Sequence, residues 1–225
     1  MSGIVAVVPV KDLANAKQRL APALAPAARA ALARCMLEDV LEALRASRRL
    51  DGILLVTLDP WAESLARRHG ARVHHEPGNR GHTAAVRSGA ERLIRDGVHG
   101  LLTMPGDIPL VTAAEIDAVI EAHDPVRGVT IVPAYDRRGS NAIACTPPDV
   151  LEFAFGDDSF LPHLQAARRA GIEPTVIVQP GIGLDVDRPE ELEAFARSAS
   201  PTRSYAWLRD NGLLPSCAAP RVAGA

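Results

Sequence analysis

Cysteine, aromatic side chains and long apolar runs are all scarce in this sequence. The 225 residues include three cysteines, Cys35, Cys145 and Cys217, whose wide spacing matches no metal-binding pattern and argues against a disulfide framework. The apolar run Ile4–Val8 is much shorter than the about 18 residues needed to cross a membrane, and no longer run follows it. We therefore expect a cytoplasmic protein without a membrane segment.

Two phosphate-binding signatures and a basic surplus are also missing. Neither the Walker A pattern nor G-x-G-x-x-G occurs, which argues against a P-loop kinase and against an NAD-dependent enzyme. The formal net charge is −2, so no overall basic field points to nucleic acid. With 47% hydrophobic and 23% charged residues, the composition is that of an ordinary soluble globular protein. We expect one domain over residues 1–198, followed by a C-terminal tail over 199–225 that is partly disordered.

Strand-like and helix-like segments alternate through the first half of the chain. The β-branched runs Ile4–Val8 and Ile53–Thr57 show no polar alternation, which is typical of strands buried on both faces of a parallel sheet. Thr112 and Glu115 fit a capping box at the start of a helix. The alternation predicts an α/β fold with a doubly wound parallel sheet and ligands at the carboxyl ends of its strands. Later expected strands, over 129–134, 142–146 and 175–178, make the sheet mixed.

A short acidic stretch near the end of the chain carries the strongest chemical signal. Asp185 and Asp187 are two residues apart, so an extended strand would place both carboxylates on one face, just before a helix opened by Pro189. Like charges this close repel unless a cation lies between them, and Mg²⁺ is the usual one. Asp107, directly after the fourth strand, would point into the same crevice. The alternative is that these acids are solvated or turn-forming residues.

A cationic loop follows the first expected strand. Lys11, Lys17 and Arg19 lie where an α/β fold places its ligand, and three cations around one loop suit a polyphosphate. A solvated basic loop is the alternative interpretation. The polar loop 79–82, after the third strand, is a candidate for contact with a nucleotide base, although a plain polar loop fits equally well.

Two serines lie in glycine-containing turns of the second half. Ser140 follows Gly139, and Ser159 follows Gly156 and precedes an expected helix. The amides at such a helix start form a natural anion site. The alternative is that Ser159 only caps the helix and Gly139 only forms a turn.

Several short motifs occur in the order and rough spacing of a known family. They are Pro9-Val10-Lys11, Lys17-x-Arg19-Leu20, Asp107-Ile108-Pro109, Gly139-Ser140-Asn141-Ala142, Phe155-Gly156-x-x-Ser159-Phe160-x-x-His163 and Gly183-Leu184-Asp185-Val186-Asp187-x-Pro189. Over roughly residues 4 to 195, the chain resembles the guanylyltransferases of coenzyme F420 biosynthesis. That family includes 2-phospho-L-lactate, phosphoenolpyruvate and 3-phospho-D-glycerate guanylyltransferases.

The resemblance implies a single Rossmann-like nucleotidyltransferase domain of the glycosyltransferase-A type, with GTP as donor and Mg²⁺ as cofactor. The resemblance implies substrate binding by Ser140, Gly156 and Ser159 and metal binding by Asp107, Asp185 and Asp187. From their positions after the expected strands, we predict that Lys11, Lys17 and Arg19 act in catalysis and that Asn79, Gly81 and Thr83 bind the nucleotide. Thr83 stands where many relatives carry asparagine, which puts one nucleotide contact in doubt.

The implied reaction is transfer of GMP from GTP to a small phosphoacid, with release of pyrophosphate. The expected acceptor is 3-phospho-D-glycerate or phosphoenolpyruvate rather than 2-phospho-L-lactate. Two alternatives stay open: a nucleotidyltransferase of the same fold with another acceptor or NTP, such as a molybdenum-cofactor or sugar-acid type, and a nucleotide-binding module without catalysis. We expect no nucleic-acid or membrane partner, and an exposed helix face could form a homodimer.

Overall fold

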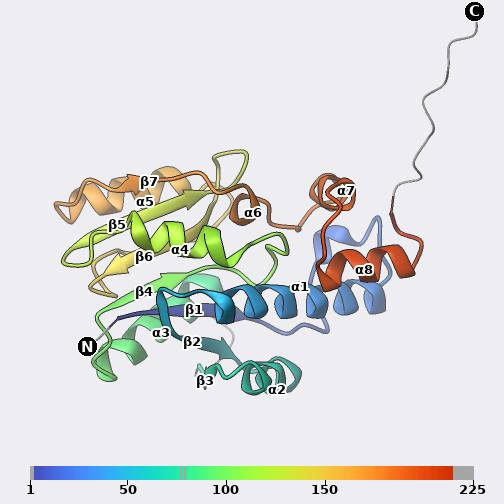
Figure 1. Ribbon diagram of the computed structural model, residues 1–225, viewed down its shortest axis with the longest axis horizontal. Coiled ribbons are helices and arrows are strands. Elements are labelled where there is room, and N and C mark those ends of the chain that lie inside the picture. Colours follow the sequence, from blue (N-terminus) through green and yellow to red (C-terminus); the bar gives the residue numbers. More distant parts are fainter. Residues whose placement is uncertain (1–2, 77, 79, 215–225) are drawn as a thin grey trace, which may run out of the picture.

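One seven-stranded sheet forms the centre of the molecule (Figure 1). The computed structural model describes residues 3–76, 78 and 80–214. The strand order across the sheet is β3-β2-β1-β4-β6-β5-β7. The strands are β1 (Ile4–Val10), β2 (Leu50–Thr57), β3 (Arg72–His74), β4 (Gly100–Thr103), β5 (Gly128–Pro133), β6 (Ser140–Thr146) and β7 (Thr175–Val176).

The sheet is mostly parallel, as the alternation predicts, with one reversed strand. β1 pairs in parallel with β2 and β4, β2 pairs in parallel with β3, and β5 pairs in parallel with β7. β6 runs antiparallel to both β4 and β5. Thr103 at the end of β4 lies opposite Ile143, so the first residue of β6, Ser140, extends past the carboxyl end of β4. The beginning of β6 therefore lies at the same edge of the sheet as the ends of the parallel strands.

Helices cover both faces of the sheet. α1 (Pro26–Ala46), α2 (Pro60–Arg68) and α4 (Ala113–Glu121) pack on one face, and α3 (His82–Arg95) and α5 (Phe160–Arg169) pack on the other. Each face has its own apolar core, because strands buried on both sides supply side chains to both. The predicted capping box is confirmed: Thr112 accepts a hydrogen bond from Glu115 N, and the Glu115 side chain accepts one from Thr112 N.

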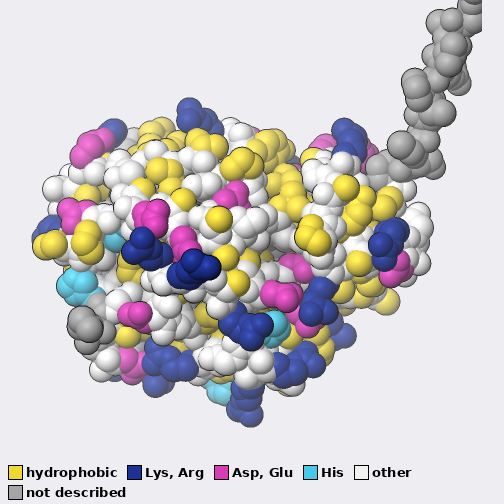
Figure 2. All heavy atoms as spheres, in the orientation of Figure 1, with side chains coloured by type: hydrophobic (Ala, Val, Ile, Leu, Met, Phe, Trp, Pro, Cys, Tyr) yellow, Lys and Arg dark blue, Asp and Glu magenta, His cyan; other side chains and the backbone are white. Residues whose placement is uncertain are grey.

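A third, smaller apolar core lies at one end of α1. It joins α1 to α7 (Pro189–Arg197) and α8 (Arg203–Asp210) through Met36, Phe195 and Leu208, all of them buried. Residues 203–210 of the expected tail are thus a helix packed on the domain, and residues from 215 onward lie outside the described part. On the face shown in Figure 2, hydrophobic side chains and charges of both signs are interspersed. None of the helices in the described residues is both long and apolar enough to cross a membrane.

Candidate active site

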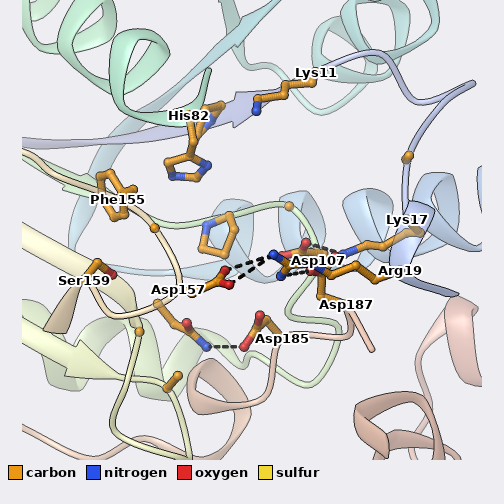
Figure 3. A pocket seen from close by; sticks show the side chains of 18 of the residues that line it. Lys11, Lys17, Arg19, His82, Asp107, Phe155, Asp157, Ser159, Asp185 and Asp187 are labelled. Carbon is orange, nitrogen blue, oxygen red and sulfur yellow. Dashed lines mark hydrogen bonds and ion pairs between the residues drawn. The ribbon is translucent and has the colours of Figure 1, made fainter. Parts of the chain in front are cut away.

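A large cavity opens at the edge of the sheet where the parallel strands end (Figure 3). Its volume is about 910 Å³, within the range of sites that enclose small-molecule ligands. The lining includes all but one of the residues predicted from the sequence: Lys11, Lys17, Arg19, Gly81, Thr83, Asp107, Ser140, Gly156, Ser159, Asp185 and Asp187. Asn79 lies outside the described residues. The fold therefore brings together segments that are far apart in the sequence.

Lys17 has its ammonium between two of the carboxylates. Its Nζ pairs closely with Asp107 and lies 3.5 Å from Asp187 Oδ1. The side chain is buried, and burial alone would lower its pKa. The charges of Asp107 and Asp187 outweigh that effect and raise the pKa of Lys17 above its ordinary value. Lys17 is therefore a permanent cation inside the site.

Arg19 connects two sides of the cavity near its opening. Its guanidinium donates to Asp187 at 2.9 Å and to Asp157 at 3.0 Å, and half of its side chain is exposed. Asp157 lies in the loop that leads to α5, so this pair joins the loop after β1 to the loop before α5. Asp157 was not among the residues predicted from the sequence, although it occupies one of the unspecified positions of the Phe155–His163 motif. Lys11 faces the cavity from the other side, near His82 (Figure 3), and forms no ion pair with any described residue.

The acidic stretch is extended but does not belong to the sheet, so the expected strand is wrong. A short helix, α6 (Pro180–Gly183), follows β7, and residues 184–188 form an irregular segment held to the loop after β4 by Val186 N, which donates to Asp107 O at 3.0 Å. Val186 is buried in the small third core, while Asp185 and Asp187 face the cavity. The predicted alternation holds, because an extended backbone sends successive side chains to opposite sides.

Asp185 is the most perturbed carboxyl group of the site. Burial, reinforced by the charge of Asp107, raises the pKa of Asp185 to about 6. Asn141 opposes this shift: its Nδ2 donates to Asp185 Oδ1 at 3.1 Å and also to two main-chain oxygens of α6. Asn141 is another residue without a predicted role, although it belongs to the Gly139–Ala142 motif. It fixes the position of Asp185 against β6.

The charges in the cavity nearly balance. Among the described lining residues, six side chains are cationic (Lys11, Lys17, Arg19, Arg80, Arg138 and Arg188) and seven are acidic (Asp12, Asp107, Asp136, Asp157, Asp185, Asp187 and Glu191). A nucleoside triphosphate entering this cavity would bring negative charge that these side chains alone do not neutralise. An additional cation would have to accompany it.

The donor chemistry of the three aspartates fits Mg²⁺, but they do not form a ready-made cage. Within residues 3–76, 78 and 80–214, no three His, Cys, Asp or Glu side chains come close enough together to hold a metal. Lys17 separates Asp107 from Asp187. Mg²⁺ commonly binds through one or two carboxylates together with substrate phosphates, so carboxylates of this kind suit a metal that arrives with a nucleotide.

Two hydroxyls lie at the far side of the cavity. Ser140 N donates to Ser159 Oγ at 3.1 Å, and His163 Nδ1 lies 3.0 Å from Ser140 Oγ. Ser159 stands at the N-cap position of α5, but its side chain makes no capping hydrogen bond there. The amide of Phe160 donates to Arg138 O, so the first amide of α5 is already occupied. The two serine hydroxyls, rather than that amide, are therefore the polar groups offered to a ligand.

Thr83 contributes a contact within the protein. Its Oγ1 accepts a hydrogen bond from Phe155 N at 3.0 Å, which fastens the loop before α5 to the start of α3. His82 packs edge-on against the Phe155 ring, with centroids 4.5 Å apart. Thr83 thus supports the loop that carries Gly156, and its contact with a nucleotide stays a prediction.

Comparison with known proteins places this arrangement in a family. The model of the family described as "Guanylyl transferase CofC like" matches residues 4–218. The chain belongs to this family. Among CofC-like relatives, the phosphoenolpyruvate guanylyltransferase of Sphaerobacter thermophilus is 40% identical over 195 residues, which are 87% of this chain and 93% of the relative.

Two further CofC-like relatives have other acceptors in their names. The 3-phospho-D-glycerate guanylyltransferase of Colwellia psychrerythraea is 33% identical over 87% of this chain and 92% of its own length. The 2-phospho-L-lactate guanylyltransferase of Methanothermobacter thermautotrophicus is 30% identical over 91% of this chain and 89% of its own. These matches confirm the resemblance seen in the sequence, and the chain is a nucleotidyltransferase.

A solved structure confirms the expected fold. A protein named as a nucleotide-diphospho-sugar transferase from Desulfovibrio desulfuricans superposes with a TM-score of 0.76 at 21% identity, over 95% of this chain and 97% of that one. The synthase of 4-diphosphocytidyl-2C-methyl-D-erythritol also superposes, with a TM-score of 0.62 at 16% identity, over 87% of this chain and 97% of that chain. This chain thus shares its mixed α/β fold with these two solved structures.

Proposed function

We propose that this chain transfers GMP from GTP to phosphoenolpyruvate and releases pyrophosphate, as a step in coenzyme F420 biosynthesis. The observation that carries the proposal is one cavity with two different ends. A cationic loop and three aspartates occupy one end, and the two serine hydroxyls occupy the other. We prefer phosphoenolpyruvate as the acceptor because the relative named phosphoenolpyruvate guanylyltransferase is 40% identical to this chain. The relative named 3-phospho-D-glycerate guanylyltransferase is 33% identical.

The proposed step is an in-line displacement at the α-phosphorus of GTP. A phosphate oxygen of the acceptor forms the new P–O bond, and the bond between the α-phosphorus and the bridging oxygen breaks, so pyrophosphate leaves with the electron pair. The attacking phosphate is already anionic near neutral pH, so no general base is required. His163 is buried and does not line the cavity, so it is not placed to act as a base on the acceptor. The main barrier is repulsion between two anions.

The residues of the cavity lower this repulsion and orient the groups. Lys11, Lys17 and Arg19 would neutralise the triphosphate and the leaving pyrophosphate. Mg²⁺ would be held by carboxylates among Asp107, Asp185 and Asp187, and when bound it supplies charge neutralisation at phosphate oxygens. Ser140, Gly156 and Ser159 would bind the acceptor at the opposite end.

Product analysis tests the proposal directly. The protein is incubated with GTP, Mg²⁺ and an equimolar mixture of phosphoenolpyruvate, 3-phospho-D-glycerate and 2-phospho-L-lactate, and the products are identified by mass spectrometry. The expected main product is GMP joined to phosphoenolpyruvate through a diphosphate. Replacing GTP by ATP, CTP or UTP should reduce the yield. A main product from another acceptor would contradict the proposed substrate, and GTP binding without any product would contradict catalysis.

A further inference from the structure

His163 lies beneath the acceptor end of the cavity without facing it. It belongs to α5, its side chain is fully buried, and it is not part of the cavity lining. Both ring nitrogens have partners. Ala154 N donates to Nε2 at 3.0 Å, and Nδ1 lies 3.0 Å from Ser140 Oγ. The residue therefore connects the loop before α5 with the first residue of β6.

The main-chain partner determines which nitrogen carries the proton. An amide N–H can only donate, so Nε2 must be the unprotonated nitrogen that accepts. A neutral imidazole has a single proton, which is then on Nδ1. Burial, with a smaller contribution from His82, lowers the pKa of His163 to about 4, so the ring stays neutral near pH 7. One tautomer is thus fixed by the backbone.

The fixed tautomer sets the direction of the Ser140 hydroxyl. Nδ1–H donates to Ser140 Oγ, so this oxygen is an acceptor toward His163 and its own proton must point elsewhere. Ser159 Oγ is in the same situation, since it accepts from Ser140 N. Among the described residues neither hydroxyl donates to a protein acceptor, and both serines line the cavity. Their protons are directed at whatever occupies this end.

We propose that His163 is a positioning residue that holds the Ser140 hydroxyl as a hydrogen-bond donor toward an anionic oxygen of the acceptor phosphoacid. The inference rests on the proposed function, since it takes this end of the cavity to bind the acceptor. His163 acts only through Ser140 and leaves the nucleotide end untouched. Without its Nδ1 proton, the Ser140 hydroxyl could turn toward residue 163 and point its lone pairs at the anion.

A double-mutant cycle on acceptor binding tests the proposal. In His163→Gln the side-chain oxygen can take the place of Nε2 and accept from Ala154 N, while no donor atom takes the place of Nδ1 beside Ser140 Oγ. The KM for phosphoenolpyruvate should rise about 10-fold, with kcat and the KM for GTP nearly unchanged, since one directed hydrogen bond to an anion is lost. Ser140→Ala should have a similar effect. Adding His163→Gln to Ser140→Ala should change the KM no further, because His163 works through that hydroxyl.

A matched control uses a second histidine–serine pair outside the cavity. His74 Nε2 lies 2.8 Å from Ser88 Oγ, and neither residue lines the cavity. His74→Gln should leave the KM for phosphoenolpyruvate unchanged. If the His163→Gln and Ser140→Ala effects multiply in the double variant, or if the KM for GTP rises as much as that for the acceptor, His163 has a general structural role and the proposal is overturned.

A measurement on the unmodified protein covers the case in which a variant fails to fold. Nitrogen-15 NMR of the histidine rings should show the proton of His163 on Nδ1 near pH 7, and a proton on Nε2 would overturn the inference. This measurement needs no acceptor. If product analysis finds 3-phospho-D-glycerate instead of phosphoenolpyruvate, the cycle is run with that acid, so the proposed substrate can fail while the role of His163 stands.

Discussion

At the scale of single residues, Lys17 has the most constrained surroundings in the site. Its backbone adopts the left-handed conformation, with φ of 57°, which is uncommon for a residue with a side chain. Its buried ammonium is shared by Asp107 and Asp187. A triphosphate that enters the cavity competes with these carboxylates for the same cation. Lys17 can therefore exchange its ion pairs with Asp107 and Asp187 for an ion pair with a ligand phosphate without moving far.

Replacing Lys17 should cost much more activity than replacing Arg19. We expect Lys17→Ala to lower kcat/KM for GTP about 100-fold or more, because a buried charge aimed at the phosphates is lost. Arg19→Ala should lower it about 10-fold, because half of the Arg19 side chain is exposed and its interactions are screened by water. Pyrophosphate release at saturating acceptor measures both. Equal losses in the two variants would contradict this ranking, provided that both variants melt cooperatively.

The charged residues of the site could be predicted from the sequence, but the side chains that they contact could not. Asp107, Lys17 and Asp187 could be found because each follows a strand or precedes a helix, and strand ends meet at one edge of an α/β sheet. The pairing of His163 with Ser140 joins residues 23 apart, and that of Arg19 with Asp157 joins residues 138 apart. Nothing in a linear pattern shows which side chains will meet across such distances.

At the scale of the elements, the C-terminal helix is fastened by a carboxylate from another helix. Asp39 of α1 accepts from Arg203 N at 2.7 Å and from Ser204 N at 3.0 Å, so it caps the start of α8. Burial raises the pKa of Asp39, while the hydrogen bonds from α8 oppose the shift. Leu208 on the same helix is completely buried. The chain after residue 198 thus adds to the packing of α1 and α7.

Removing this cap should destabilise the whole domain. Asp39→Ala leaves two amides at the start of α8 without their acceptor, so we expect the free energy of unfolding to fall by about 2 kcal/mol. Urea unfolding followed by circular dichroism measures the change. Asp210→Ala is the matched control, because Asp210 is an exposed acid at the end of α8 that pairs only with its neighbour Arg209 among the described residues.

Truncation gives an independent check on the same helix. A chain that ends at residue 198 lacks α8 and exposes apolar side chains on α1, so it should unfold at lower urea concentration than a chain that ends at residue 214. Equal midpoints for the two chains, together with an Asp39→Ala variant as stable as the wild type, would show that α8 is a dispensable tail. The domain boundary placed after residue 198 stays a prediction until then.

The elements themselves could be predicted more fully than their directions. Buried runs such as Ile4–Val8 and Ile53–Thr57 indicate strands, since they are short and rich in β-branched residues and a sheet covered on both sides needs continuous apolar sequence. The residues of β6 do not show its reversal, because a strand buried on both faces reads the same in either direction. The short connection from β5 does show it, since a parallel pair needs a crossover of a dozen or more residues. The prediction of a strand at Asp185 was wrong for a related reason. Alternating burial requires an extended backbone, and it does not require a neighbouring strand.

At the scale of the whole molecule, the cavity is a charge-balanced cleft between two differently built halves. The β1–β2–β3 half contributes cations from the loop after β1, and the β6–β5–β7 half contributes the serines and the loop before α5. Ion pairs of Arg19 with Asp157 and Asp187 join the two sides. The protein has no large surplus of positive charge for two anionic substrates. The homodimer expected from the sequence stays a prediction, which size-exclusion chromatography with light scattering would test.

This balance predicts a strict requirement for a divalent cation. Chelation by EDTA should abolish pyrophosphate release, and added Mg²⁺ should restore it, because cationic side chains already paired with acids cannot neutralise GTP and the acceptor together. Asp187→Asn should raise the Mg²⁺ concentration needed for half-maximal rate. Full activity in EDTA, or a variant with wild-type magnesium dependence, would show that the aspartates serve only to hold Lys17 and Arg19.

The antiparallel direction of β6 brings segments of two different kinds to one edge of the sheet. Lys11 and Asp107 follow the parallel strands β1 and β4, whereas Asp185 and Asp187 lie in the irregular segment after α6. Ser140 and Ser159, which we propose to bind the acceptor, lie at the first residue of β6 and in the loop that leads to α5. Asp157 in the same loop pairs with Arg19 at 3.0 Å, so a change in that loop also reaches the proposed nucleotide end. The loop before α5 therefore couples the two proposed substrate ends, so a change of acceptor made there would also alter how the nucleotide is held.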